Sequence, residues 1–451
     1  MVILNKITNL NGFKKTELGM IPEDWEIKPL GNEFIEFKNG LWKGKKEPFI
    51  KVKVLRNTNF RSDGFLNFDN IAELYVEQRQ FSTREIVKGD IIVERSGGGP
   101  TQPVGRVVYF DRENKFKYSF SNFTTRIRVI NKDKVFSKYL FYFLLEFYLS
   151  GKTNDIQNRT TGIRNLDFSK YKQVPVIFPS LPEQQKIAAV LSAVQEAKEK
   201  TEQVINATKE LKKSMMKYLF TYGPVPLGET ENVTLKETEL GPLPEEWEVV
   251  TLKSHLLLNE SGVWGDAPSE GEIGIEVFRS TNIQNSNWVF GDVARRHLTE
   301  KQLRRYQLKE GDILITKSSG SKKHIGKAAY VNDSIEDRKV AFSNFMQRIQ
   351  FGNYILPKFS FFYITSDRGR KALLRRSTTT TGLRNLTKTD IESLLIPLPP
   401  LYEQRKIASI LSAIDEKIQA EENKKNALDE LFKSMLHNLM TAKIRVNNLE
   451  V

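Results

Sequence analysis

The chain has 451 residues, no cysteine and a formal net charge of +14 at pH 7. This length predicts two to four domains, and the lack of cysteine excludes a disulfide framework and thiol chemistry. The first residues show no signal-peptide pattern, and the longest apolar cluster, 139–149, is too short to span a bilayer. We therefore expect a cytoplasmic protein.

The first part of the chain, residues 1–160, mixes predicted strands with one helix. Apolar and polar residues alternate over 51–55 and 125–130, and short apolar runs at 91–93 and 106–110 follow glycines. An aromatic-rich segment, 137–149, predicts a helix. We expect a globular domain in which strands and helices are mixed.

A junction and a long helix follow over residues 161–223. Apolar positions recur at alternating intervals of four and three residues, which is typical of a helix that buries one stripe against a partner. These positions are Val190, Val194, Ala197, Thr201, Val204, Thr208, Leu211, Met215 and Tyr218. Ser180 and Pro182 favour a helix start, and Gly223 an end.

The second half of the chain repeats the first. Thr16-Glu17-Leu18-Gly19 returns at Thr238 and Ser121-Asn122-Phe123 at Ser343, both 222 positions later, and Thr161-Gly162-Ile163-Arg164-Asn165-Leu166 returns at Thr381. We therefore expect a second globular domain over 224–380 and a second junction and helix over 381–451. The second stripe contains Ile407, Leu411, Ile414, Ile418, Leu428, Met435 and Leu439.

The two predicted helices, each of about 40 residues, most simply pack on each other. The expected fold is α+β: two mixed globular domains separated by an antiparallel coiled coil, with an internal pseudo-twofold repeat. The alternative is that each helix packs on its own globular domain, although this would usually need a wider apolar stripe.

The positive charge lies outside the predicted helices. Segment 182–222 has seven Lys and five Glu, and segment 401–442 has six Lys or Arg and seven Asp or Glu. The remainder therefore carries +13. This segregation favours binding of a polyanion, most simply nucleic acid, by the globular domains.

The paired junctions resemble those of one known family. Thr-Gly-Ile/Leu-Arg-Asn-Leu, followed by prolines and by Glu-Gln-x-Lys-Ile-Ala at the start of a long helix, is similar to the specificity (S) subunit of type I restriction–modification enzymes. The resemblance implies two target recognition domains, each reading one half of an asymmetric, bipartite duplex DNA target. It also implies a subunit that is not catalytic and binds no cofactor itself.

The same resemblance implies partners. Two modification subunits would bind the paired helices and methylate adenine at N6 with S-adenosylmethionine. Restriction subunits would join them and use ATP and Mg. A rod of fixed length would hold the two domains at a fixed separation, so the gap between the half-sites would be measured and need not be read.

Three loops of each globular domain combine basic, amide and aromatic residues that suit base edges and phosphates. In the first domain the candidates are Asn39, Trp42, Lys43 and Lys45, then Arg56, Asn57, Asn59 and Arg61, then Arg95, Ser96, Gly97, Gly98, Thr101 and Gln102. In the second domain they are Trp264, then Arg279, Ser280 and Asn282, then Lys317, Ser318, Ser319, Lys322, Lys323 and His324. The third loop is the strongest candidate because it is glycine-rich and basic and follows a strand in both copies.

Structural roles compete with these assignments. In the repeated junction, the sequence leaves three roles open for Arg164 and Arg384: a DNA contact, docking of a partner subunit, or a structural role. Gly162 and Asn165 are best interpreted as residues of a structural turn. Trp25 and its counterpart Trp247 are assigned to packing.

No pattern in the sequence supports catalysis by this chain alone. Gly320–Lys327 has the wrong glycine spacing for a P-loop, and the four histidines show no metal-ligand spacing. Two alternatives to a DNA-reading subunit remain: a protein-binding scaffold, and a DNA-modifying enzyme that acts without partners.

Overall fold

The computed structural model describes residues 12–42, 44–99, 102–113, 116–160, 163–321, 323–380 and 383–446. The chain forms two compact units. Unit 1 comprises the residues up to Thr201 together with those from Lys424 onward, and unit 2 comprises Glu202–Asn423. Each unit therefore contains one part of each long helix, α4 (Leu181–Tyr222) and α10 (Leu401–Met440).

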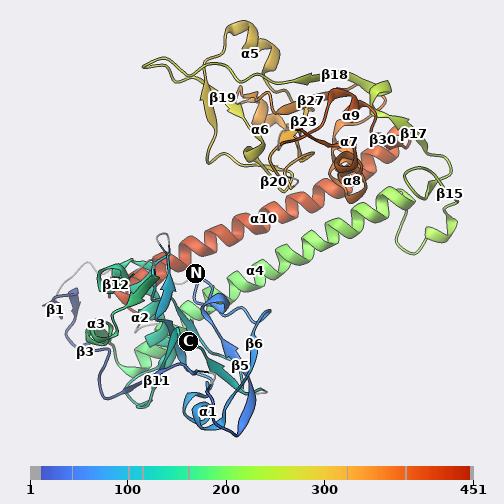
Figure 1. Cartoon of the computed structure of the whole chain (residues 1–451). Coiled ribbons are helices and arrows are strands. Elements are labelled where there is room, and N and C mark those ends of the chain that lie inside the picture. Colours follow the sequence, from blue (N-terminus) through green and yellow to red (C-terminus); the bar gives the residue numbers. More distant parts are fainter. Residues whose placement is uncertain are drawn as a thin grey trace. The chain divides into compact units, whose positions relative to one another are not determined.

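Unit 1 contains most of the first half of the repeat (Figure 1). Its strands are β1 (Phe13–Thr16), β2 (Gly19–Pro22), β3 (Glu26–Pro29), β4 (Ile35–Asn39), β5 (Phe49–Leu55), β6 (Ala72–Glu77), β7 (Ile91–Glu94), β8 (Ser96–Gly98), β9 (Val107–Tyr109), β10 (Tyr118–Phe120), β11 (Thr124–Val129), β12 (Gln157–Thr160), β13 (Ile163–Leu166) and β14 (Pro175–Phe178). Its other helices and 3₁₀ turns are η1 (Asn57–Asn59), α1 (Gln78–Arg84), α2 (Ser137–Leu149), η2 (Lys152–Ile156) and α3 (Phe168–Gln173).

Unit 2 repeats this plan. Its strands are β15 (Leu235–Lys236), β16 (Leu243–Pro244), β17 (Glu248–Thr251), β18 (Leu256–Ser261), β19 (Ile275–Phe278), β20 (Ile283–Gln284), β21 (Asn287–Trp288), β22 (Ala294–Arg296), β23 (Ile313–Thr316), β24 (Ser318–Ser319), β25 (Ala328–Tyr330), β26 (Ala341–Phe342), β27 (Met346–Phe351), β28 (Thr378–Thr380), β29 (Leu383–Asn385) and β30 (Leu395–Leu398). Its other helices and 3₁₀ turns are η3 (Thr230–Asn232), η4 (Leu252–His255), η5 (Ser280–Asn282), α5 (Glu300–Tyr306), α6 (Asp333–Glu336), α7 (Pro357–Thr365), α8 (Asp367–Arg376) and α9 (Lys388–Glu392).

Three sheets of unit 1 have counterparts in unit 2. Unit 1 has a four-stranded antiparallel sheet, β4-β11-β7-β9, and unit 2 has β18-β27-β23-β25. A three-stranded sheet lies beside each: β10-β5-β6, in which β10 is parallel to β5, and β22-β19-β26, in which β26 is parallel to β19. The junction strand joins a third sheet in both units, β12-β13-β8 and β24-β29-β28.

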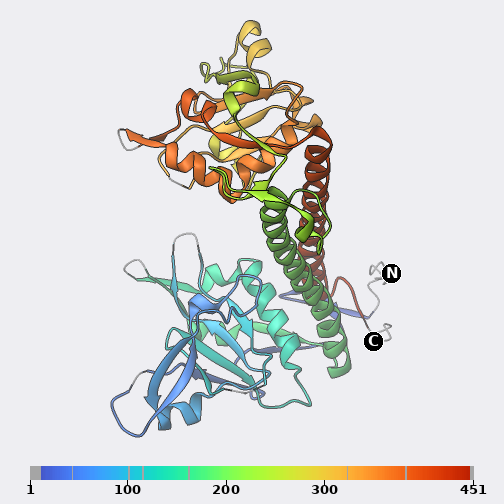
Figure 2. The ribbon, with the colours of Figure 1, turned by 90° about the vertical axis from the view of Figure 1, so that its right-hand side faces the viewer.

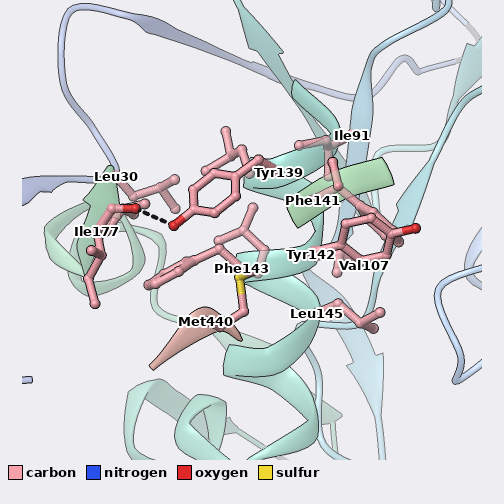
Figure 3. Close-up of a cluster of buried hydrophobic side chains, with 14 of the residues drawn as sticks. Leu30, Ile91, Val107, Tyr139, Phe141, Tyr142, Phe143, Leu145, Ile177 and Met440 are labelled. Carbon is pink, nitrogen blue, oxygen red and sulfur yellow. Dashed lines mark hydrogen bonds between the residues drawn. The ribbon is translucent and has the colours of Figure 1, made fainter. Parts of the chain in front are cut away.

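The aromatic helix α2 fills the core of unit 1 (Figure 3). Tyr139 is fully buried, and its hydroxyl donates to the carbonyl oxygen of Ile177 at 2.7 Å. Burial raises the pKa of this phenol well above its ordinary value. Phe143 and Met440 belong to the same cluster, so the end of α10 completes the core of this unit.

The two long helices pair in antiparallel fashion within each unit (Figures 1 and 2). In unit 2, Lys209 of α4 pairs with Glu422 of α10 at 2.6 Å, and Lys212, further along α4, pairs with the earlier Asp415 at 2.6 Å. In unit 1, Lys198 pairs with Asp429 at 2.6 Å. The predicted fold class, two mixed units with an antiparallel helix pair, is confirmed.

The predicted apolar stripe of α4 is partly wrong. Val204 and Leu211 are exposed, whereas Gln195 and Lys198 are buried. Polar partners explain the difference. The side-chain amide of Gln195 accepts from the Tyr142 hydroxyl and donates to the backbone carbonyl of Asp63. Lys198 forms an ion pair with Asp429 of α10. A pattern that counts only apolar residues cannot find such positions.

Candidate nucleic-acid interface

One loop follows a central strand of the four-stranded sheet in both units, after β7 and after β23. In unit 1 the backbone N–H groups of Arg95 and Ser96 both donate to the carbonyl oxygen of Phe123, at 2.8 and 3.2 Å. The equivalent residues of unit 2 make the same two bonds at 3.0 and 3.3 Å. This third loop therefore begins from one backbone geometry in both units.

The repeated junction holds the third loop in place. The N–H of Leu166 donates to the carbonyl of Arg95 at 2.8 Å, and the Ser96 hydroxyl hydrogen-bonds to the Asn165 carboxamide. The counterparts in unit 2 are Leu386 to Lys317 at 2.7 Å and Ser318 to Asn385. Asn165 and Asn385 thus lie on strands, β13 and β29, and the predicted turn at Asn165 is wrong because this residue pairs with β8 and β12. Gly162 lies outside the described residues.

The second loop is shaped by a buried asparagine in each unit. Asn59 is 2% exposed, and its side-chain oxygen accepts from the N–H of Arg56 at 2.9 Å. Its amide nitrogen donates to the carbonyl of Asn67 at 3.1 Å. Asn282 makes the equivalent bond to the N–H of Arg279, also at 2.9 Å. Both predicted site residues are therefore buried and hold the backbone of this loop.

A pocket of about 500 Å³ brings the three predicted loops of unit 1 together. Its lining residues are Leu41, Trp42, Val54, Arg56, Asn57, Thr58, Leu74, Gly97, Ser121, Asn122 and Phe123. Trp42 is 66% exposed and Phe123 49% exposed, so aromatic faces meet solvent at this site. Such faces are suited to stacking on nucleobases.

Two details fix the pocket wall. A Cβ atom at Gly40 would lie 1.8 Å from the carbonyl oxygen of Ser121, so only glycine lets these backbones approach. The amide nitrogen of Asn57 donates to the carbonyl of Ser96 at 2.5 Å, which ties the second loop to the third. The buried side-chain oxygen of Asn57 has no hydrogen-bond partner among the described residues.

The corresponding loops of unit 2 share this backbone arrangement but carry different side chains. The guanidinium of Arg296 lies over the ring of Trp264, 4.1 Å from its centre. The Lys317 ammonium donates to the Ser261 hydroxyl at 2.5 Å, and burial lowers its pKa. The pKa of His324 is lowered by burial and by neighbouring cations.

The remaining predicted residues have varied surroundings. Arg61 pairs with Asp63 at 2.7 Å, Arg279 pairs with Asp292 at 2.8 Å, and Arg384 donates to the Ser377 hydroxyl at 2.9 Å. The residues that are exposed or half-buried on the loops or strands are Asn39, Lys45, Gly97, Gln102, Arg164, Ser280, Ser319 and Lys323, whereas Gly98 is buried. The residues outside the described part of the chain are Lys43, Thr101 and Lys322.

Sequence reasoning missed several residues of this region. Leu74 and Phe123 line the pocket of unit 1, and Lys327 and Arg370 lie beside the third loop of unit 2. The repeated Ser-Asn-Phe tripeptide was a signal for Phe123. Arg370 gave no signal because α8 meets the loop only in the folded chain. The predicted packing role of Trp25 and Trp247 is confirmed, since both are buried.

Among the described residues, no group of three or more His, Asp or Glu side chains is arranged to hold a metal ion. No helix in this part of the chain combines the length and apolarity that crossing a membrane requires.

Comparison with known proteins agrees with this frame. The family model described as "Type I restriction modification DNA specificity domain" matches residues 22–210 and 244–430. A Methanocaldococcus jannaschii protein named as the MjaX type I restriction enzyme specificity subunit is 28% identical over 463 residues, covering 99% of this chain and 100% of that protein. The EcoKI specificity subunit of Escherichia coli K12 is 21% identical, with 86% and 82% covered.

A solved structure shares the fold. The crystal structure of a type I restriction–modification S subunit from M. genitalium superimposes with a TM-score of 0.55 at 15% identity, covering 92% of this chain and 96% of that one.

Proposed function

The chain belongs to the type I restriction–modification DNA specificity family, and on this premise we propose that it is the non-catalytic subunit that selects the DNA target of such a complex. The observation that carries the proposal is the duplicated loop frame. Two units with the same backbone anchors present different side chains to the outside, as expected of two readers of different sequences.

Each unit reads one half of a bipartite, asymmetric duplex target. Support comes from the third loop, which places Arg95 in unit 1 where unit 2 has Lys317, and which further on contains Gln102 in unit 1 but Lys323 and His324 in unit 2. Arginine and lysine recognise guanine edges and phosphates, whereas glutamine favours adenine. Different side chains on equivalent positions give different half-sites.

The helix pair sets the gap between the half-sites. An uninterrupted helix of 42 residues is about 63 Å long at about 1.5 Å per residue. The ion pairs that join α4 to α10 in each unit support a stiff antiparallel pair of fixed register. The half-sites would then be separated by a fixed number of base pairs.

The helices also bind two modification subunits. Support comes from apolar side chains that α4 and α10 leave exposed, Val204 and Leu211 in unit 2 and Leu431 in unit 1. Exposed apolar residues on a long helix suit a partner helix. S-adenosylmethionine would be bound by these subunits, and ATP and Mg²⁺ by the restriction subunits of the full complex. We also propose that the chain acts in the cytoplasm, where its partners would act on DNA.

Mapping methylated adenines in the host genome tests the proposal. We expect a split, asymmetric motif that is present in the wild type and disappears when this gene alone is deleted. Restoring the gene should restore the motif. A genome whose adenine methylation is unchanged by the deletion would contradict the proposal, as would purified chain that methylates or cuts DNA without partners.

A further inference from the structure

Three cationic side chains, Lys323, Lys327 and Arg370, cluster with the imidazole of His324 at the third loop of unit 2. The Lys327 ammonium lies 3.1 Å from Nδ1 of His324, and Arg370 of α8 donates to the carbonyl oxygen of Lys323 at 3.1 Å. A Cβ atom on Gly326 would lie 2.8 Å from Nη1 of Arg370, so the guanidinium rests directly against the loop. Loop and helix thus bring four nitrogen groups to one place.

No carboxylate neutralises this cluster in the described part of the chain. Among those residues, Lys323, Lys327 and Arg370 have no Asp or Glu within ion-pair distance, and Nη1 of Arg370 is buried without a hydrogen-bond partner. Burial and the charge of Arg370 lower the pKa of Lys327, and burial lowers that of Arg370. Cations that lose part of their solvent contact are ordinarily paired, so the half-buried Lys327 and Arg370 raise the free energy of the folded chain when no ligand is bound.

Unit 1 resolves the same position differently. There Arg106 pairs with Glu94 at 2.8 Å, and both side chains are largely buried. Lys327 and Thr316 stand at these positions of unit 2, since the Thr316 N–H donates to the Lys327 carbonyl at 2.8 Å, as the Glu94 N–H does to the Arg106 carbonyl. The first unit therefore neutralises its cation internally, whereas the second leaves positive charge open at the loop.

We propose that Lys327, Arg370, Lys323 and His324 form a phosphate-binding site that holds one backbone phosphate of duplex DNA against unit 2. The inference rests on the proposed function and extends it to residues outside the predicted loop. A guanidinium and ammonium groups donate several charge-assisted hydrogen bonds to phosphate oxygens. The contact anchors the second half-site without reading its sequence.

Lys327→Gln in the full chain tests the proposal by two measurements, the unfolding temperature, which should not fall, and the affinity for duplex DNA, which should fall. Removing one of several crowded, unpaired cations should leave the unfolding temperature unchanged or raise it. Affinity for duplex DNA should fall about tenfold for every sequence, and the slope of log affinity against log salt should shrink by about 0.9, the value for one phosphate. Arg370→Gln should weaken DNA binding in the same way. Arg304→Gln, an exposed residue of α5, should change neither quantity.

The outcomes separate this inference from the proposed function. If the wild type binds duplex DNA and Lys327→Gln binds with the same affinity and salt slope, the phosphate site is wrong and the DNA-reading role stands. A lower unfolding temperature in Lys327→Gln would assign it a structural role and also overturn the site. Inorganic phosphate that stabilises the wild type but not the variant, with DNA binding unchanged, would show a site for free phosphate instead. A wild type that binds no duplex would overturn both proposals.

Discussion

The indole N–H of Trp25 donates to the carboxylate of Glu183 at 3.1 Å, and the repeat makes the same bond from Trp247 to Glu403 at 2.7 Å. Each bond ties the beginning of a globular half to the first turn of its long helix. In unit 1 a third group joins, because Arg445 donates to both oxygens of Glu183 at 3.0 and 2.7 Å. The chain after α10 is thereby fixed to the beginning of α4.

Arg445→Ala should destabilise unit 1. Glu183 is nearly buried, and losing the guanidinium leaves its charge with the indole as its remaining hydrogen-bond partner in the described structure. Breaking an ion pair of this kind costs about 1–3 kcal/mol when one partner keeps some solvent contact. Urea unfolding of the full chain measures the change. Arg375→Ala, on an exposed part of α8, is the control, and equal stability of the two variants would contradict the role of Arg445.

Trp42→Ala should weaken specific DNA binding without weakening the fold. The side chain is exposed at the mouth of the unit 1 pocket, so its truncation removes little packing. Loss of an aromatic stacking face costs about 1–3 kcal/mol of binding free energy. Titration of target duplex into both proteins gives the value. Tyr354→Ala, which changes an aromatic side chain that is also exposed but lies in unit 2, should bind as the wild type does; if Trp42→Ala also does so, the pocket takes no part in DNA binding.

The pattern of residues predicted the elements well and the interface only in part. Segments 51–55, 91–93, 125–130 and 137–149 became β5, β7, β11 and α2 because alternation and helical periodicity are local properties. The pocket is not local: its lining residues range from Leu41 to Phe123 in the sequence, and Leu74 reaches it from β6.

Two misread positions have the same physical cause. Lys198 is buried because Asp429, more than two hundred positions away, supplies its charge partner. Asn165 extends a strand because β8 offers a free edge to pair with. In both cases a distant partner overrides the local preference.

DNA binding should strengthen below pH 6.5 through His324. Burial and the nearby cations Lys327, Arg370 and Lys323 hold its pKa below the ordinary 6.5, so the imidazole is neutral at pH 7.5 in the free chain. A bound phosphate favours the protonated form, so binding takes up a proton and tightens as the pH falls. Between pH 7.5 and pH 5.5, the dissociation constant for duplex DNA should fall several-fold more for the wild type than for His324→Gln. The same pH dependence in both would exclude His324 from the contact.

The free chain should respond to pH in the opposite direction. Because the folded state lowers the pKa of His324, the unfolded state binds the proton more readily below pH 6.5. The contribution of His324 to the free energy of unfolding is therefore present above pH 6.5 and is lost as the pH falls. Urea unfolding of the wild type and of His324→Gln at pH 7.5 and 5.5 measures this contribution. The part of the pH dependence that comes from His324 should be missing in the variant.

Shortening both helices should shorten the recognised gap. Removing one heptad from α4 around Lys212 and one from α10 around Asp415, which face each other at 2.6 Å, preserves the phase of the apolar stripes. The pair becomes shorter by about 10 Å, which corresponds to about three base pairs of duplex. Selection of bound sequences from a library with variable gaps gives the preferred spacing. An unchanged gap would contradict the role of the helices as a ruler.

Replacing residues 16–160 by the corresponding segment of another family member tests the central claim most directly. The target of the resulting complex is mapped by sequencing methylated adenines. We expect one half of the split motif to change while the other half and the gap stay as they were. A change in both halves, or in neither, would contradict the account of two independent readers on one repeated frame.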